Sequence, residues 1–300
     1  MANYIVTIGD SVHWGQGLTT PHKLHTIVAR EVRKTTPDLI EHFMAHSGAV
    51  IGVGLTVTNQ RVDGEVPVPS PTILEQAAGF PGDPADVLAV LVNGGINDIT
   101  IQNILNPFVS TQQLADLTKE HCLDSMEVLL DELAQRFPAA TTKIIVTGYY
   151  PILSYRSNPV AIHMLQQFHG IFVPPAFEVT FTAAHNPVVD HCLQFWKQSR
   201  THLQDAVTQA AAAYPGRIFQ YVDPGFTERN AVFADDPLLF GLTIPTFLPN
   251  DEVVHPRHTA CNGVFDPIDF LAREGCYRAS AGHPNVAGAK RYADAILAVI

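Results

Sequence analysis

Positive charge is scarce in this chain of 300 residues. Lys and Arg together number 18 against 29 Asp and Glu, which gives a formal net charge of −11. A surface that binds nucleic acid needs enough cations to neutralise a row of phosphates. The sequence also has no basic stripe interleaved with aromatic residues. The composition therefore argues against a nucleic-acid partner.

Cysteine is scarce as well. Four cysteines are too few for a disulfide scaffold in a chain of this length. They form no Cys-x-x-Cys pair, which argues against a structural zinc site. Cys122 and Cys192 fall inside helical patterns and are expected to be small core residues. Cys261 and Cys276 bracket a predicted loop and can pair if the compartment is oxidising.

Long apolar runs are missing. No stretch reaches the length of a membrane span, so we expect no span. The first predicted strand begins by residue 3, which leaves no room for a signal peptide. We therefore expect a cytoplasmic protein, or a secreted one if a leader has been removed.

What the sequence does contain is an alternation of apolar strands and amphipathic helices. Several strands are apolar throughout, as expected when helices cover both faces of a sheet. This order predicts an α/β fold: a three-layer αβα sandwich around a parallel five-stranded sheet, flavodoxin-like in its connections. The predicted strands are Tyr4–Ile8, Leu39–Ala45, Val87–Asn93, Lys143–Tyr149 and Arg217–Val222, and the main helices cover residues 22–35, 112–137 and 187–213.

Two stretches interrupt the alternation, at about 151–186 and 224–282. Connections of this length are usually functional or disordered. Their apolar content favours ordered insertions that cover one edge of the sheet. No linker, repeat or low-complexity run marks a boundary, so residues 1–300 are expected to form a single domain.

Polar and small residues follow three of the predicted strands. Ser11 comes after the first, Ser47-Gly48 after the second, and Asn97 after the third. In parallel sheets, ligands bind beyond the carboxyl ends of the strands, near the point where the strand order reverses. These residues are therefore expected to meet at one edge.

Ser11 and His283 supply the parts for nucleophilic catalysis. A serine hydroxyl needs a base to take its proton, and His283 begins a run of apolar residues at helical spacing. Pro284 suits the first helical position, so we expect His283 at or near the N-cap, where the helix dipole keeps the ring neutral. Activity should then rise with pH as the ring loses its proton. His13 is a rival base, but it lies too close to Ser11 in sequence and is expected to be pocket wall beside Trp14.

Donors for an oxyanion can come from the backbone amides of Ser11 and Gly48 and from the carboxamide of Asn97. Asp10 is expected to brace the turn before the serine. Asp98 is expected to cap the segment that follows it. Each of the short segments that contain these residues is, on its own, equally typical of an ordinary turn.

Taken together, the residues Gly9-Asp10-Ser11, Gly48, Gly95-Ile96-Asn97-Asp98 and His283-Pro284-Asn285 resemble the SGNH/GDSL hydrolase superfamily, whose marker residues are Ser, Gly, Asn and His in that order. The resemblance spans nearly the whole chain. It implies the same αβα fold, a nucleophile at Ser11, a general base at His283, and oxyanion donors at Gly48 and Asn97.

One position departs from that pattern. The family usually has an Asp three residues before the His, and this chain has Ser280. A serine can accept the ring N–H but brings no charge. The enzyme then works as a Ser–His dyad, or a backbone carbonyl orients the ring, or an acid reaches in from the insertion. The candidate acids are Asp251, Glu252, Asp266, Asp269 and Glu274.

The first functional hypothesis is an esterase or lipase acting on a small-molecule ester, because the apolar insertions favour an acyl pocket. The second is a carbohydrate O-deacetylase, with Trp14, Tyr149 and Tyr150 along an aromatic groove. The third is a binding protein that kept the fold without the chemistry. A metal site at Asp251, His255 and His258 is disfavoured, because these residues are expected in a loop. No cofactor is expected.

Overall fold

The computed structural model describes residues 3–55, 62–159, 162, 186–243 and 246–300, and its centre is a five-stranded parallel sheet. The strand order is β2-β1-β3-β4-β5. The strand order reverses beside β1, and Ser11 follows that strand. Every predicted strand is found with ends within two residues of the expected ones. The strands are β1 (Asn3–Thr7), β2 (Leu39–Phe43), β3 (Val87–Val92), β4 (Lys143–Thr147) and β5 (Ile218–Val222).

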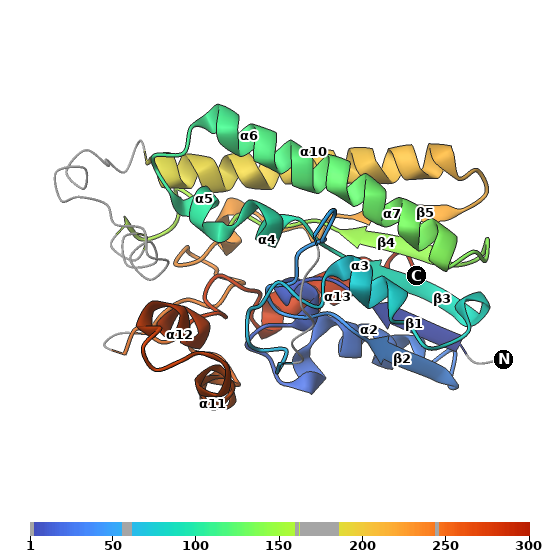
Figure 1. Cartoon of the computed structure of the whole chain (residues 1–300), viewed down its shortest axis with the longest axis horizontal. Helices are drawn as coiled ribbons and strands as arrows, with labels where there is room; N and C mark the ends of the chain where they lie inside the picture. Colours follow the sequence, from blue (N-terminus) through green and yellow to red (C-terminus); the bar gives the residue numbers. More distant parts are fainter. Residues whose placement is uncertain (1–2, 56–61, 160–161, 163–185, 244–245) are drawn as a thin grey trace.

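Helices cover both faces of this sheet (Figure 1). On one face α2 (Leu24–Val32) packs against α13 (Val286–Leu297). On the other face α10 (Pro187–Ala213) packs against α7 (Ser125–Arg136), and α7 against α3 (Ile73–Ala78). The inner strands β3 and β4 are almost completely buried, which is why they are mostly apolar, whereas the edge strands β2 and β5 are only partly buried. The predicted three-layer αβα sandwich is confirmed.

The predicted helix over 112–137 is found, with one irregularity. It consists of α6 (Thr111–Lys119), a π-helical turn η3 (Glu120–Asp124) and α7, in unbroken succession. The π turn packs against Gly95, where an added Cβ would lie 3.0 Å from the Cys122 sulfur. Single π turns inside α-helices are frequent at functional sites, and this one adjoins the segment that carries Asn97.

The second insertion differs from the prediction. Residues 224–282 were expected to be loop-like, but they contain two helices, α11 (Val254–Val264) and α12 (Phe270–Tyr277). A disulfide between Cys261 and Cys276 joins the two helices. The sequence signal was weak because apolar residues do not recur at helical spacing along α11 and Pro256 interrupts it. Both helices lie beyond the carboxyl ends of the strands (Figure 1). Most of the first insertion, 151–186, lies outside the residues that the structure describes.

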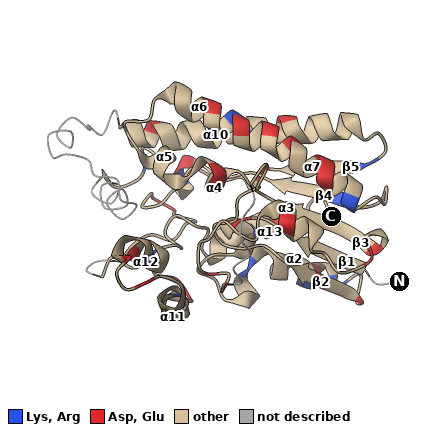
Figure 2. Cartoon of the chain, in the orientation of Figure 1, with Lys and Arg blue, Asp and Glu red and all other residues tan. Residues whose placement is uncertain are grey.

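The two free cysteines, Cys122 and Cys192, are buried, as expected of core residues. Asp and Glu are distributed along α6, α7 and α10 (Figure 2). Among the helices that could be assessed, none is both long and apolar enough to span a bilayer. The short elements are α1 (Ser11–Trp14), η1 (Thr20–His22), η2 (Pro84–Asp86), α4 (Ile96–Ile99), α5 (Ile101–Leu105) and η4 (Glu228–Asn230).

Candidate active site

Ser11 is the first residue of the short helix α1, directly after β1. Asp10 is the N-cap of this helix, and its carboxylate accepts a hydrogen bond from the Val12 amide at 2.8 Å. Such a cap fixes the sharp turn from strand to helix. The turn places the Ser11 hydroxyl at the carboxyl edge of the sheet, as predicted.

The Asp10 carboxylate is fully buried and has two further partners. The Asn93 carboxamide donates to it at 2.6 Å, and the Tyr149 hydroxyl donates at 2.8 Å. Burial raises the pKa of this carboxyl group, and the three hydrogen bonds oppose that shift. Asp10 therefore braces the turn below the serine, as the sequence indicated.

His283 reaches the serine from the far end of the chain. Its Nε2 lies 2.7 Å from the Ser11 Oγ, across a separation of 272 residues. The loop that holds the ring pairs with Phe240, whose amide donates to the His283 carbonyl at 2.8 Å. The Gly282 amide donates back to the Phe240 carbonyl, also at 2.8 Å. A histidine at this distance can accept the serine proton directly.

His283 was predicted at or near the helix N-cap, and it lies two residues before that position. The N-cap of α13 is Asn285, whose side-chain oxygen accepts from the amides of Ala287 and Gly288. Pro284 does not begin the helix, because it is paired with Leu239 in an isolated antiparallel bridge. His283 therefore lies ahead of the helix, in a turn in which its amide donates to the Ser280 carbonyl at 2.9 Å.

Gly48, on the loop after β2, and Asn97, on the short helix α4 after β3, lie at the same edge, and these two segments are tied together. The Asn97 carboxamide donates one of its two N–H hydrogens to the Ala49 carbonyl at 3.0 Å. Gly48 has φ +79°, and a Cβ there would lie 2.5 Å from the Val68 amide nitrogen. Only glycine fits both this backbone conformation and this close approach.

Asp98 ties the same two segments from the other side. Both of its carboxylate oxygens lie 3.1 Å from the Ile51 amide. The prediction that Asp98 caps the segment that follows it is therefore wrong. Burial raises the pKa of Asp98, and the Ile51 amide opposes that shift. The segments of Gly48 and Asn97 are thus held in a fixed relation to each other.

A cavity of about 670 Å³ opens beside the Ser11–His283 pair. Its polar lining includes Ser11, Ser47, Asn97, Thr100, Gln102 and His283. The rest is predominantly apolar and comes from both the sheet edge and the α11–α12 hairpin. Apolar lining residues include Val50, Val68, Ile101, Leu105, Ile152 and Phe265. A pocket of this size and lining is typical of small-molecule sites.

Two sequence-based expectations about the pocket wall are wrong. His13 is fully buried away from the cavity lining, with its ring nitrogens 2.9 Å from the Ile8 carbonyl and from the Thr147 hydroxyl. Burial lowers the pKa of His13 to about 4, so this ring is neutral near pH 7. Trp14 stacks on Phe43 instead of lining the cavity.

The proposed aromatic groove is not formed either. Of Trp14, Tyr149 and Tyr150, only Tyr150 is among the lining residues that the structure describes. The Tyr149 hydroxyl is bonded to Asp10 and to the Ile96 amide. Among the residues that the structure describes, the lining is therefore mainly aliphatic.

Behind His283 the structure adds residues that sequence reasoning did not bring together. The Ser280 hydroxyl donates to Asp251, whose carboxylate also pairs with Arg257. Arg257 pairs in turn with Glu65 at 3.2 Å. Asp251 was one of five candidate acids, but Arg257 and Glu65 were missed. No local pattern could reveal them, because Glu65 and Arg257 are separated by 192 positions.

The same contacts bear on the candidate metal ligands. His255 and His258 lie on α11, not in a loop as expected. Asp251 already pairs with Arg257 and Ser280. Among the described residues, no three His, Cys, Asp or Glu side chains come together in a group that could hold a metal ion.

No protein-family model matches the sequence, and no curated protein matches it. Solved structures do resemble it. Phospholipase A1 from Streptomyces albidoflavus NA297 superposes with a TM-score of 0.50 at 12% identity, over 100% of this chain and 98% of that one. The lipase Lip_vut3 from a goat rumen metagenome gives 0.49 at 11% identity, over 99% and 97%. The carbohydrate acetylesterase Est24 from Sinorhizobium meliloti gives 0.39 at 13% identity, over 99% and 97%.

At such low identity the likeness concerns the fold, and it extends over the whole described architecture. The parallel sheet and its two helical layers agree with the architecture implied by the resemblance of the marker residues. The chain has the fold of the SGNH/GDSL-type hydrolases.

Proposed function

We propose that this protein is a serine hydrolase that cleaves carboxylic esters through an acyl-enzyme on Ser11. The observation that carries the proposal is the 2.7 Å contact between the Ser11 Oγ and the His283 Nε2 in the lining of a mostly apolar cavity. The fold resembles that of a solved structure named as a phospholipase A1.

In the first half of the reaction, the neutral ring of His283 takes the Ser11 proton on Nε2 while the Oγ attacks the ester carbonyl carbon. The carbonyl oxygen becomes an oxyanion. It accepts hydrogen bonds from the amides of Ser11 and Gly48 and from the second N–H of Asn97. His283 then gives its proton to the leaving alcohol as the carbon–oxygen bond breaks.

In the second half, a water takes the place of the alcohol. His283 removes a proton from this water as it attacks the acyl carbon, and the same donors hold the second oxyanion. His283 returns the proton to the Ser11 oxygen as the acid leaves. Every group used here belongs to the chain, so no cofactor is required by this mechanism.

The lining favours an acyl chain over a sugar. Sugar sites are expected to present ring faces along an open groove, and Tyr150 alone lines the described part of this cavity among the three aromatics considered. Aliphatic side chains dominate instead. We therefore place an esterase or lipase acting on a medium-length acyl group ahead of a carbohydrate O-deacetylase.

The experiment is an acyl-chain series of p-nitrophenyl esters from acetyl to dodecanoyl, with the Ser11→Ala variant as control. We expect kcat/KM to rise beyond acetyl, because each buried methylene adds roughly 0.8 kcal/mol of binding. A sharp drop beyond acetyl would favour the deacetylase. A fluorophosphonate probe tests the nucleophile itself: absence of a covalent adduct on Ser11 would favour the third hypothesis, a binding protein.

A further inference from the structure

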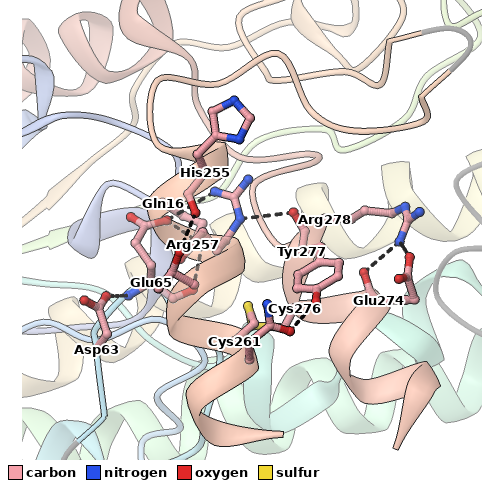
Figure 3. The surroundings of a disulfide bond; sticks show 12 residues. Gln16, Asp63, Glu65, His255, Arg257, Cys261, Glu274, Cys276, Tyr277 and Arg278 are labelled. Carbon is pink, nitrogen blue, oxygen red and sulfur yellow. Dashed lines mark hydrogen bonds and ion pairs between the residues drawn. A yellow bond between two sulfur atoms is a disulfide. The ribbon is translucent and has the colours of Figure 1, made fainter. Parts of the chain in front are cut away.

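Arg257 forms the centre of a buried ion cluster between the hairpin and the sheet edge. Its side chain has no exposed surface, and neither has that of Asp251, with which it pairs. Its second carboxylate partner, Glu65, is 9% exposed and lies at 3.2 Å. The guanidinium also donates to the Tyr277 carbonyl at 3.1 Å. Figure 3 shows Arg257 reaching from α11 toward Glu65 on one side and Tyr277 on the other.

One carboxylate of this cluster holds the segment that follows the nucleophile. Glu65 accepts hydrogen bonds from the Trp14 indole at 2.8 Å and from the Gln16 carboxamide at 3.0 Å. Trp14 is the last residue of α1, and Ser11 is the first. Glu65 thus fixes the end of the helix that carries the serine.

The other carboxylate holds the segment that carries the base. The Ser280 hydroxyl donates to Asp251, and the Ser280 carbonyl accepts from the His283 amide at 2.9 Å. A displacement of Ser280 would therefore move the turn that presents the imidazole.

The two sides also touch each other at Gly17. A Cβ on this glycine would lie 2.7 Å from the Ser280 Cβ and 3.1 Å from the Asp251 Cβ. The Gly17 carbonyl accepts from the Glu252 amide at 3.0 Å. The segment around Gly17, which follows α1, is therefore packed directly against Asp251 and Ser280.

Holding the hairpin together does not account for this cluster, because the Cys261–Cys276 disulfide already does so. Removing charges from water costs several kcal/mol per ion unless each is paired and hydrogen-bonded. A buried acid that contacts Ser280, at the position where the related family pattern has the triad acid, suits a role in aligning the base.

We propose that Asp251, acting through Ser280, is the positioning carboxylate for His283, and that Arg257 joins it to the Glu65 segment behind Ser11. This inference rests on the proposed function. It makes the site more than a dyad: the negative charge sits one hydroxyl further from the base than in the family pattern. In this arrangement the Ser280 hydroxyl donates a hydrogen bond to Asp251, and its lone pairs can accept hydrogen bonds.

The test compares Asp251→Asn, Ser280→Ala and the double variant Asp251→Asn/Ser280→Asp. The double variant moves the carboxylate to position 280, where Arg257 can still pair with it. For Asp251→Asn we expect kcat to fall roughly ten- to a hundredfold, less than the about ten-thousandfold that a neutralised triad Asp costs in serine proteases, with KM within about twofold. Ser280→Ala should also lower kcat. The double variant should recover most of the loss.

Glu252→Gln is the matched control, because it removes the adjacent carboxylate, which contacts Thr19 and His22 instead of Ser280. It should keep the wild-type kcat. A merely structural role would not produce recovery of kcat when the acid is moved, so a double variant as slow as Asp251→Asn would overturn the proposal. A folded Asp251→Asn enzyme with unchanged kcat would overturn it as well.

Should Asp251→Asn fail to fold, Ser280→Ala and the double variant decide, since both keep a carboxylate beside Arg257. A wild-type rate in Ser280→Ala would then reject the proposal. Failure of the proposed function is a separate outcome: the wild type itself would neither hydrolyse esters nor react with a fluorophosphonate.

Discussion

At the scale of single residues, two histidines near the nucleophile have opposite surroundings. His13 follows Ser11 by two positions, yet it is enclosed by the protein and bonded to Ile8 and Thr147. His283 is distant in sequence, yet its Nε2 meets the Ser11 hydroxyl. Proximity along the chain is therefore a poor guide to which histidine can act as a base, because a helical turn directs neighbouring side chains to different sides.

Replacing either member of the pair should remove activity without unfolding the protein. We expect Ser11→Ala and His283→Ala each to lower kcat by at least about a thousandfold, and the double variant to be hardly slower than either single one, because the two groups act as a unit. Steady-state ester hydrolysis measures the loss, and circular dichroism checks the fold. His13→Gln serves as control and should keep most of the activity. Equal losses of kcat in Ser11→Ala, His283→Ala and His13→Gln would reject the assignment of the base.

His13 should make the protein sensitive to acid. Its pKa in the folded state is lowered from 6.5 to about 4 by burial, so the unfolded chain binds a proton that the native state refuses between these values. The contribution of His13 to the free energy of unfolding is fully present above about pH 6.5. It is lost as the pH drops toward 4, by up to about 3 kcal/mol at roughly 1.4 kcal/mol per pKa unit.

Urea unfolding of the wild type and of His13→Gln from pH 4 to 7 measures this effect. The difference between the two curves isolates it, since the raised pKa of Asp10 acts in the opposite direction in both proteins. Parallel curves over the whole range would contradict the prediction.

At the scale of elements, the site is built from loops at strand ends that are tied to one another in pairs. The loop of Gly48 is joined to the segment of Asn97 by hydrogen bonds to Ala49 and Ile51. The segment of His283 is joined to Phe240. Loops fixed in this way can present oxyanion donors without rearrangement during the reaction, which is where most of their value for catalysis lies.

Gly48→Ala should damage the oxyanion loop. The new Cβ would press on the Val68 amide at a backbone conformation that alanine avoids, and we expect kcat to fall by about a hundredfold, the typical cost of one lost donor. Gly216→Ala is the matched control: its φ is +86°, with nothing within 4 Å of the added Cβ. It carries the same backbone strain far from the site and should leave kcat unchanged. A similar loss in both variants would indicate general destabilisation.

The disulfide should stabilise the α11–α12 hairpin. It closes a loop of 15 residues, for which chain entropy predicts about 3 kcal/mol. We expect Cys261→Ala/Cys276→Ala to unfold at lower urea, and a reductant to shift the wild type in the same direction. The double variant itself should not respond to the reductant. A wild type indifferent to reduction would contradict the prediction.

At the scale of the whole molecule, Ser11 and His283 meet only because β1 and the segment before α13 lie at the same edge of one sheet. The unfolded chain cannot hold them together. Fluorophosphonate labelling of Ser11 should therefore disappear in the same urea range as the near-ultraviolet circular dichroism signal. Labelling that persists after this signal is lost would mean that Ser11 reacts without its partner.

The sequence predicts much of this architecture because buried parallel strands are continuous apolar runs. Their ends bring Ser11, Gly48 and Asn97 to one edge. It fails where long-range contacts decide the local structure. Pro284 is paired with Leu239 in a bridge, and the helix starts only at Val286, with Asn285 as its N-cap. In the sequence, Arg257 resembles an ordinary surface residue. In the structure it is buried and paired with Glu65, which lies 192 positions away.

The α11–α12 hairpin, which contributes Phe265 and Leu271 to the lining of the cavity beside Ser11, also carries Arg257. Any insertion, deletion or repacking that reshapes the cavity from this side therefore disturbs the support of the histidine as well. Engineering a new acyl preference through α11 and α12 should alter turnover at the same time, whereas changes on α5, across the cavity, should leave turnover intact. Selectivity and speed are coupled on one wall and independent on the other.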